Sequence, residues 1–210
     1  MMRVAIPWLR SEGDEMFHVD DLIVYLRLVY SRHFFDLFEG QITSQIKIIR
    51  ASQASGRDKK MWSEEARQSL RYAFFLRYYA SFESHLTLIC DRLAQNDSLT
   101  LRLKDINGDH FLNRVNKYLT RVANRDSLDT HPLWKDVLSY TFIRNAIIHN
   151  DGRVLEPKSI PQHVAQVFQQ PSAGISLKPN GTILLKRRFC YRAVRQMAQF
   201  LLDVYGRKKI

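Results

Sequence analysis

One short run of the chain places an arginine, an amide and a histidine close together: Arg144, Asn145 and His149. A guanidinium stays positively charged and binds phosphate oxygens, and an imidazole gains or loses a proton near neutral pH. These groups can cleave a phosphodiester, with the histidine as general acid or base and the arginine stabilising the charge that develops on the phosphate. This run is therefore the candidate catalytic site.

The run lies at the end of a predicted helix from Trp134 to His149, which Asp151-Gly152 closes. At about 100° per residue, Asn145 and His149 are about 40° apart and share a face of that helix. Arg144 lies about 140° from His149 by the same geometry. For both cations to reach one phosphate, either the Arg144 side chain curls round or the last helical turn loosens. In a structural alternative, Asn145 and His149 hydrogen-bond to each other at the edge of the core.

Glu83 is the candidate partner of Arg144. It is the only charged member of a small, apolar face on the second long predicted helix: Ala73, Leu76, Ala80, Glu83, Thr87, Cys90 and Ala94. A carboxylate on such a face needs a partner, and a guanidinium can meet it with two hydrogen bonds. We expect Glu83 to be buried and to orient Arg144 toward a phosphate. A purely structural ion pair, or a face that is open to water, remains an alternative.

Helices are the elements that must position these residues. Two long helices are expected from Val19 to Ile49 and from Ser63, as N-cap, to Ala94, with a loop from Ala51 to Lys60 between them. Their adjacency predicts an antiparallel hairpin. The remaining predicted helices are shorter and cover Phe111 to Val122, Trp134 to His149, Gln162 to Phe168 and Phe189 to Tyr205.

A β-hairpin is expected shortly before the last helix, because Asn180-Gly181 separates two apolar runs, Gly174 to Lys178 and Thr182 to Leu185. The expected fold class is all-α in the main. It is an antiparallel helical bundle with two long N-terminal helices and a small β-hairpin before the last helix. We expect a single domain over residues 1–210, with residues 153–186 as a loop-and-hairpin insertion.

Positive charge is concentrated in two segments. The formal net charge is +11; residues 186–210 hold eight basic residues and one acidic residue, and residues 101–125 hold six and two. Such clusters favour a polyanionic partner such as a nucleic acid, although solvated helix faces or an anionic membrane surface would also account for them. The candidate nucleic-acid-binding residues are five cations of the last segment: Lys186, Arg187, Arg188, Arg192 and Arg195.

Several function classes lack their motifs. The histidines show no metal-ligand spacing, and we find no glycine-rich phosphate loop and no nucleophile elbow, so we expect no metal and no cofactor. Cys90 and Cys190 lack a Cys-x-x-Cys spacing and are expected to be free thiols. Met1 to Glu15 has no apolar core of signal-peptide length, and no stretch approaches the roughly 20 apolar residues that span a bilayer. We expect a cytoplasmic protein without a membrane segment.

The motif resembles the signature of the HEPN superfamily (higher eukaryotes and prokaryotes nucleotide-binding), in which an arginine, a polar residue, three further positions and a histidine lie late in a helical bundle. Arg144, Asn145 and His149 occupy the matching positions. The resemblance implies a metal-independent endoribonuclease, of the kind found among prokaryotic toxins and defence effectors, with two motifs meeting across a homodimer cleft. The implied partners are RNA, a second copy of the chain and, in a toxin, an antitoxin protein.

Other functions remain open from the sequence. The bundle could be a non-catalytic module that binds RNA or a protein, with the basic last helix supplying affinity. A DNA-binding regulator is disfavoured because the sequence shows no compact helix-turn-helix pattern.

Overall fold

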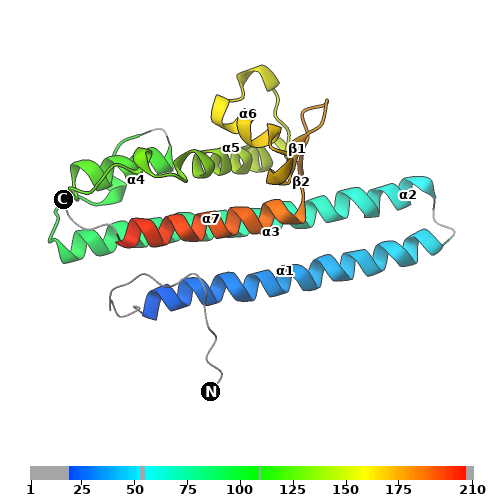
Figure 1. Cartoon of the computed structure of the whole chain (residues 1–210), viewed down its shortest axis with the longest axis horizontal. Coiled ribbons are helices and arrows are strands. Elements are labelled where there is room, and N and C mark those ends of the chain that lie inside the picture. Colours follow the sequence, from blue (N-terminus) through cyan, green and yellow to red (C-terminus); the bar gives the residue numbers. More distant parts are fainter. Residues whose placement is uncertain (1–18, 53–54, 109, 207–210) are drawn as a thin grey trace.

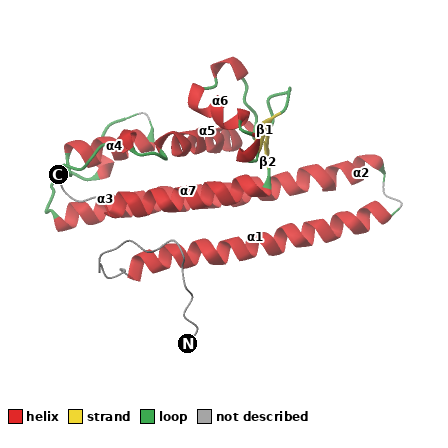
Figure 2. Cartoon of the chain, viewed as in Figure 1, coloured by secondary structure: helices red, strands yellow, loops and turns green. Residues whose placement is uncertain are grey.

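The computed structural model describes residues 19–52, 55–108 and 110–206 (Figure 1), and only the backbone at residues 19–32, 61, 62, 157 and 206. These residues are mainly helical, with one two-stranded antiparallel sheet before the last helix (Figure 2). The predicted fold class is therefore confirmed. Residues Met1 to Glu15, and residues 207–210 of the basic C-terminal segment, lie outside the described part of the chain.

Two long helices form the predicted antiparallel hairpin. Helix α1, Val19–Ala51, runs beside α3, Arg67–Asn96, in the opposite direction (Figure 1). Between them, α2, Gly56–Lys60, leads into a π-helical turn, η1, Met61–Ala66, which continues directly into α3.

The structure corrects two details of that hairpin. The second half of the predicted loop from Ala51 to Lys60 is helical, since α2 begins at Gly56. Ser63 is not an N-cap: it lies inside η1, and its hydroxyl donates to the Lys60 carbonyl at 3.2 Å. No helix terminus exists there to be capped, because α2, η1 and α3 follow one another without a break.

The later helices follow the predicted order. Helices α4, Phe111–Arg121, and α5, Trp134–Asn150, are followed by the short α6, Gln162–Gln169, and the last helix α7, Arg187–Gly206. Single 3-10 turns interrupt the connections: Leu103–Asp105, Leu128–Thr130, Pro157–Ser159 and Pro171–Ala173.

The predicted hairpin is also present and fastens the end of α5. Strands β1, Ile175–Leu177, and β2, Ile183–Leu185, pair antiparallel around a turn in which Gly181 has a φ of 80°. The Ile183 amide donates to the Gly152 carbonyl at 2.8 Å, and the Val154 amide donates to Gly181 at 2.9 Å. The segment directly after α5 is therefore tied to the hairpin by backbone hydrogen bonds.

The core is built on the aromatic face of α3. Phe75, Tyr79, Phe82 and Leu86 are each at most 2% exposed, and they belong to a continuous buried cluster that extends to Val204 on α7. Each such side chain stabilises the folded state by roughly 1.5–3 kcal/mol relative to exposure in water. Helices α5 and α7 pack against this face, which positions the motif helix beside α3.

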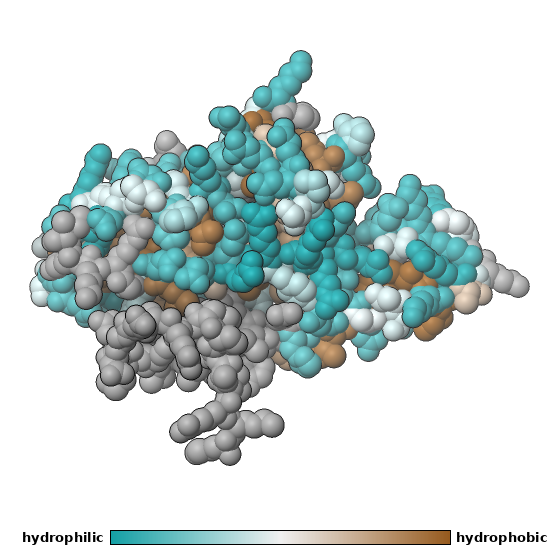
Figure 3. Space-filling model, viewed as in Figure 1, coloured by the Kyte–Doolittle hydropathy of each residue, from teal (hydrophilic) through white to brown (hydrophobic). Residues whose placement is uncertain are grey.

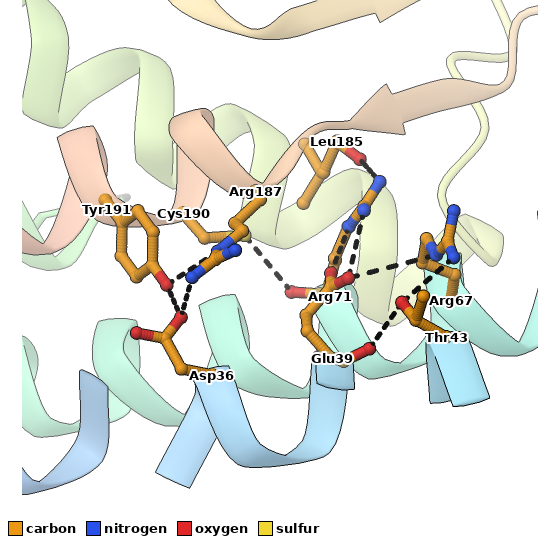
Figure 4. Close-up of polar contacts among 9 residues, drawn as sticks. All are labelled: Asp36, Glu39, Thr43, Arg67, Arg71, Leu185, Arg187, Cys190 and Tyr191. Carbon is orange, nitrogen blue, oxygen red and sulfur yellow. Dashed lines mark hydrogen bonds and ion pairs between the residues drawn. The ribbon is translucent and has the colours of Figure 1, made fainter. Parts of the chain in front are cut away.

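A buried carboxylate joins α1 to the rest of the bundle. Glu39 is 6% exposed and accepts hydrogen bonds from Arg71 Nε at 2.6 Å and Nη2 at 3.3 Å. Arg71 Nη1 donates to the Leu185 carbonyl at 2.9 Å. Figure 4 shows the Arg71 guanidinium between these two acceptors, so a single side chain links α1, α3 and β2.

Helix α1 has more apolar surface than the bundle covers. Its described half buries Phe35 and Ile46 but leaves four large apolar side chains more than half exposed: Phe34, Leu37, Phe38 and Ile48. Apolar patches are visible among hydrophilic residues at the end of the molecule where α1 ends and α2 begins (Figure 3).

Candidate functional site

Helix α5 presents the motif at its C-terminal end. Its apolar residues at three-and-four spacing, from Trp134 to Ile147, are buried against the bundle. The helix ends where Asp151 adopts a left-handed conformation with φ 50° and Gly152 follows with φ 73°. The Gly152 amide closes the last turn on the Ala146 carbonyl at 3.0 Å. This closed end keeps the motif helical through Asn150.

Arg144 is held by three neighbouring groups. Its Nη2 lies 3.9 Å from Glu83 Oε2 on α3, and its Nη1 donates to Asn145 Oδ1 at 2.9 Å. The guanidinium carbon lies 5.9 Å from the centre of the Tyr79 ring, within cation–π range. The Arg144 side chain is still 31% exposed. The guanidinium is therefore oriented by the protein and open to water at the same time.

Glu83 pairs with Arg144 as predicted, but its surroundings differ from those expected. Ala73 and Ala80 are exposed and the Glu83 side chain is 26% exposed, so the expectation that Glu83 is buried is wrong. The physical reason is size: the core takes the aromatic face of α3, because large apolar side chains gain more from burial than alanines do. Ala73 and Ala80 of the small-residue face are therefore left at the surface, whereas Cys90 and Ala94 at its other end are buried.

Partial burial still raises the pKa of Glu83 above its ordinary value, because desolvation outweighs the opposing effect of the Arg144 and Arg114 guanidinium groups. Glu83 therefore takes up a proton at a higher pH than a freely solvated glutamate does. Protonation removes the negative charge that faces Arg144.

His149 lies on a different side of the helix from Arg144. Because α5 remains regular to Asn150, the last turn does not loosen, and the two residues project about 140° apart. His149 is exposed, and the described residues provide it with no hydrogen bond or ion pair. Arg144 faces Glu83 instead. Within one chain, Arg144 and His149 therefore point to different sides of α5.

The structural alternative for Asn145 and His149 is not observed. Asn145 Oδ1 accepts a hydrogen bond from Arg144 Nη1, and within the described part of the chain no hydrogen bond joins Asn145 to His149. His149 is also exposed and not at the edge of the core. The amide therefore orients the arginine, and the imidazole is left free.

Three of the five cations proposed for nucleic-acid binding on or beside α7 already have partners inside the protein. Arg187 pairs with Asp36 of α1 (Figure 4), and Arg192 pairs with Asp136 of α5 at 3.2 Å. Arg188 donates to a backbone carbonyl. Part of the positive charge of this segment therefore holds helices together.

The other two cations, Lys186 and Arg195, are exposed, and no described residue pairs with either of them. Lys186 lines an open depression of about 570 Å³ together with Arg71, Arg187, Arg188 and Tyr191. This surface stays positively charged where α7 begins.

Sequence reasoning missed Tyr79 as a residue of the site. Its ring faces the Arg144 guanidinium, and its hydroxyl is hydrogen-bonded to Thr141 Oγ1 at 2.8 Å. Burial raises the pKa of Tyr79 to about 12, so the phenol stays neutral. Its spacing of four residues from Glu83 on a predicted helix was the available signal.

Within residues 33–52, 55–108 and 110–205, no group of three or more histidine, cysteine, aspartate or glutamate side chains could hold a metal ion. In the same described part of the chain, no helix has both the length and the apolar character that a bilayer-spanning segment needs. Comparisons of the sequence with protein-family models and curated proteins, and of the structure with solved structures, found no match.

Proposed function

We propose that this chain is a metal-independent endoribonuclease of the HEPN type, which acts as a homodimer. The observation that carries the proposal is the environment of Arg144: a guanidinium oriented by Glu83, Asn145 and the Tyr79 ring, yet partly open to water. That arrangement suits a cation that receives a phosphate, because its orientation is set before the substrate arrives. The exposed His149 on the same helix would supply proton transfer.

In the proposed reaction, the 2′-oxygen of a ribose attacks the adjacent phosphorus and the bond to the 5′-oxygen of the next nucleotide breaks. One His149 takes the proton from the 2′-hydroxyl, and a second imidazole donates a proton to the leaving 5′-oxygen. Arg144 stabilises the negative charge on the phosphate in the transition state. The products carry a 2′,3′-cyclic phosphate and a free 5′-hydroxyl.

The angle between Arg144 and His149 is the reason for proposing two copies. Since the two residues of one chain project about 140° apart on a regular helix, an active site needs a second motif to bring an imidazole and a guanidinium to one phosphate. A two-fold dimer would also provide the two histidines that acid and base catalysis require.

The main alternative is a module that binds RNA without cleaving it. It is favoured by the environment of His149, since the described residues offer this imidazole no hydrogen-bond acceptor that would fix its tautomer. The exposed cations Lys186 and Arg195 would then supply salt-dependent affinity.

The test is incubation of the purified chain with a panel of single-stranded and structured RNAs in EDTA. We expect cleavage by the wild type, products that end in a 2′,3′-cyclic phosphate, and loss of cleavage in His149→Ala. His33→Ala is the matched control, because His33 is an exposed histidine on α1. The rate per chain should also fall on dilution below the dimer dissociation constant. Cleavage retained by His149→Ala, or no cleavage of any RNA by the wild type, rejects the nuclease.

The proposed biological role is a cytoplasmic toxin or defence effector, whose activity an antitoxin protein would restrain. Growth arrest on expression, dependent on His149 and relieved by co-expression of a neighbouring gene product, would support this role. Wild-type growth on strong expression of an RNA-cleaving chain would favour housekeeping RNA processing.

A further inference from the structure

A second basic site lies between α3 and α4. A cavity of about 560 Å³ opens where the C-terminal half of α3 faces the 3-10 turn Leu103–Asp105 and the start of α4. Figure 1 shows α4 against that end of α3. The volume is within the range of pockets that hold small organic ligands. None of the residues proposed above for catalysis or RNA binding lines this cavity.

The cations of the cavity are available to a ligand. Arg102, Lys104 and Arg114 line it, against a single acid, Asp91. In the described part of the chain, no carboxylate lies within ion-pair distance of Lys104 or Arg114, and Arg102 Nη1 reaches only the Asp91 backbone carbonyl, at 3.5 Å. Three cations without a carboxylate partner can bind an anion such as a phosphate.

The rest of the lining suits a nucleobase. Phe111, the first residue of α4, is partly exposed in the cavity and offers an aromatic ring for stacking. Gln95 and Asp91 add an amide and a carboxylate that can hydrogen-bond to the edge of a base. Proteins that bind single-stranded nucleic acids commonly combine an aromatic ring with cations in this way.

The cavity is next to the candidate catalytic residues. Thr87, which lines it, lies one turn beyond Glu83 on α3 and donates to the Glu83 carbonyl at 3.0 Å. Arg114 is close enough to Glu83 to affect its ionisation. The cavity therefore begins one helical turn from Glu83, the residue that pairs with Arg144.

We propose that this cavity binds one nucleotide of a single-stranded RNA, with the phosphate on Arg102, Lys104 and Arg114 and the base stacked on Phe111. That this nucleotide lies beside a scissile phosphate rests on the proposed function. That the cavity binds a nucleotide does not depend on the proposed function. A free mononucleotide also has a phosphate and a base that could bind here. The experiment below distinguishes a nucleotide of an RNA strand from a free mononucleotide.

Binding is measured by fluorescence anisotropy with the full-length chain and a labelled single-stranded RNA that carries 2′-O-methyl groups and cannot be cleaved. We expect Arg114→Gln to weaken binding about 10-fold and to reduce the slope of log K against log salt by about one, as loss of a phosphate contact does. Arg50→Gln is the matched control, because Arg50 is exposed in the last turn of α1. That end of α1 lies at the opposite end of the bundle from α4 (Figure 1), so the affinity of this variant should equal that of the wild type.

The stacking contact is tested by Phe111→Leu, which keeps an apolar side chain at this partly buried position, and by Phe111→Tyr, which keeps a ring. We expect Phe111→Leu to weaken RNA binding with an unchanged salt slope and Phe111→Tyr to bind as the wild type does. Circular dichroism confirms that each variant is folded. Wild-type affinity in both Arg114→Gln and Phe111→Leu overturns the proposal.

Competition by AMP, GMP, CMP and UMP distinguishes the source of the nucleotide. Displacement of the RNA only at millimolar mononucleotide supports an RNA site, whereas displacement at micromolar concentration, lost in Arg114→Gln, overturns it in favour of a free nucleotide. Because the RNA cannot be cleaved, these affinities do not depend on catalysis. A chain that fails to cleave any RNA but loses affinity in both variants would reject the nuclease and keep this site.

Discussion

Glu83 Oε2 lies 3.9 Å from Arg144 Nη2, and this contact joins α3 to the helix that carries the motif. The separation is longer than a good charge-assisted hydrogen bond, and both side chains are more than a quarter exposed. Exposed pairs of this kind contribute at most about 1 kcal/mol to stability. The contact therefore matters more for the direction of the guanidinium than for the stability of the fold.

Replacement of Arg144 should separate these two roles. If Arg144 receives the phosphate, Arg144→Ala should reduce the rate of RNA cleavage by about 100-fold to 1,000-fold. Arg144→Lys should recover little of that loss, because an ammonium keeps the charge but cannot make the paired contacts of a guanidinium. Single-turnover cleavage assays measure the rates, and the unfolding free energy of both variants should stay within about 1 kcal/mol of the wild type. Full activity in Arg144→Ala would contradict the proposed role.

Glu83 should give the cleavage rate a dependence on acid pH. Its raised pKa means that it is protonated at a higher pH than the ordinary glutamate value of about 4.3. As the pH falls through that raised pKa, Arg144 loses its anionic partner and the wild-type rate should fall toward that of Glu83→Gln. At neutral pH the wild type should be faster. Parallel pH–rate profiles of the two proteins would show that Glu83 does not orient Arg144.

The same shift of the Glu83 pKa predicts the direction of a stability change. Because the folded state holds the Glu83 proton more tightly than the unfolded chain does, lowering the pH from the raised pKa toward the unfolded value stabilises the wild type. Glu83→Gln lacks this titrating group. The difference in unfolding free energy, wild type minus Glu83→Gln, should therefore rise as the pH falls through that window, and urea titrations at several pH values measure it.

Local patterns in the sequence predicted the helices and the hairpin, because periodicity and turn residues act over a few positions. Such local patterns predicted the end of α5 at Asp151-Gly152 and the turn at Asn180-Gly181. Contacts between residues that are far apart in the sequence could not be predicted in this way, because tertiary packing decides them. Glu39 and Arg71 are 32 residues apart, and His131 and Asp203, which are 3.0 Å apart between Nε2 and Oδ2, are separated by 72. No local rule selects such partners.

In the candidate site, too, local geometry was predicted from the sequence and burial was not. The spacing of Arg144, Asn145 and His149 predicted their angles on the helix, and the regular form of α5 leaves those angles unchanged. The pairing of Glu83 with Arg144 was predicted because a lone carboxylate on an apolar helix face needs a partner and a guanidinium can meet it with two hydrogen bonds. The exposure of Glu83 could not be predicted from the sequence. It depends on which face of α3 packs against the core, and the aromatic face does so.

Loss of the buried carboxylate should destabilise the fold. Glu39→Gln leaves Arg71 without its anionic partner in a buried setting, and we expect a loss of about 3 kcal/mol in unfolding free energy. Gln41→Ala, an exposed change on the same helix, should stay within about 0.5 kcal/mol of the wild type. Urea denaturation compares the two. A Glu39→Leu, Arg71→Met double variant should recover part of the loss, because it removes both charges together.

The two cysteines should react only when the protein unfolds. Burial raises the pKa of both Cys90 and Cys190 to about 12, so almost no thiolate exists in the folded state at pH 8. In the unfolded chain an ordinary thiol pKa of about 8.5 makes both reactive. Ellman's reagent should therefore label neither thiol rapidly in buffer and both in denaturant. Rapid labelling of one native thiol would contradict its burial.

Two glycines should respond to alanine in opposite directions. Gly152 has φ 73°, and a Cβ there would collide with the Tyr72 hydroxyl, which itself donates to the Ile183 carbonyl. Gly152→Ala should cost at least about 2 kcal/mol, because it combines a strained conformation with overpacking. Gly40 lies inside α1, and a Cβ added there would meet no atom within 4 Å, so Gly40→Ala should stabilise the fold by about 0.5–1 kcal/mol.

Gly152 also closes the helix that carries the motif, so its substitution should affect function as well as stability. If the end of α5 and the hairpin shift to make room for a Cβ, His149 moves with them, and cleavage should fall even where Gly152→Ala remains folded. Gly40→Ala should cleave at the wild-type rate. Thermal unfolding and single-turnover cleavage on both variants provide the measurement, and a Gly152→Ala protein with full stability would show that the contact of Gly152 with Tyr72 does not determine how α5 ends.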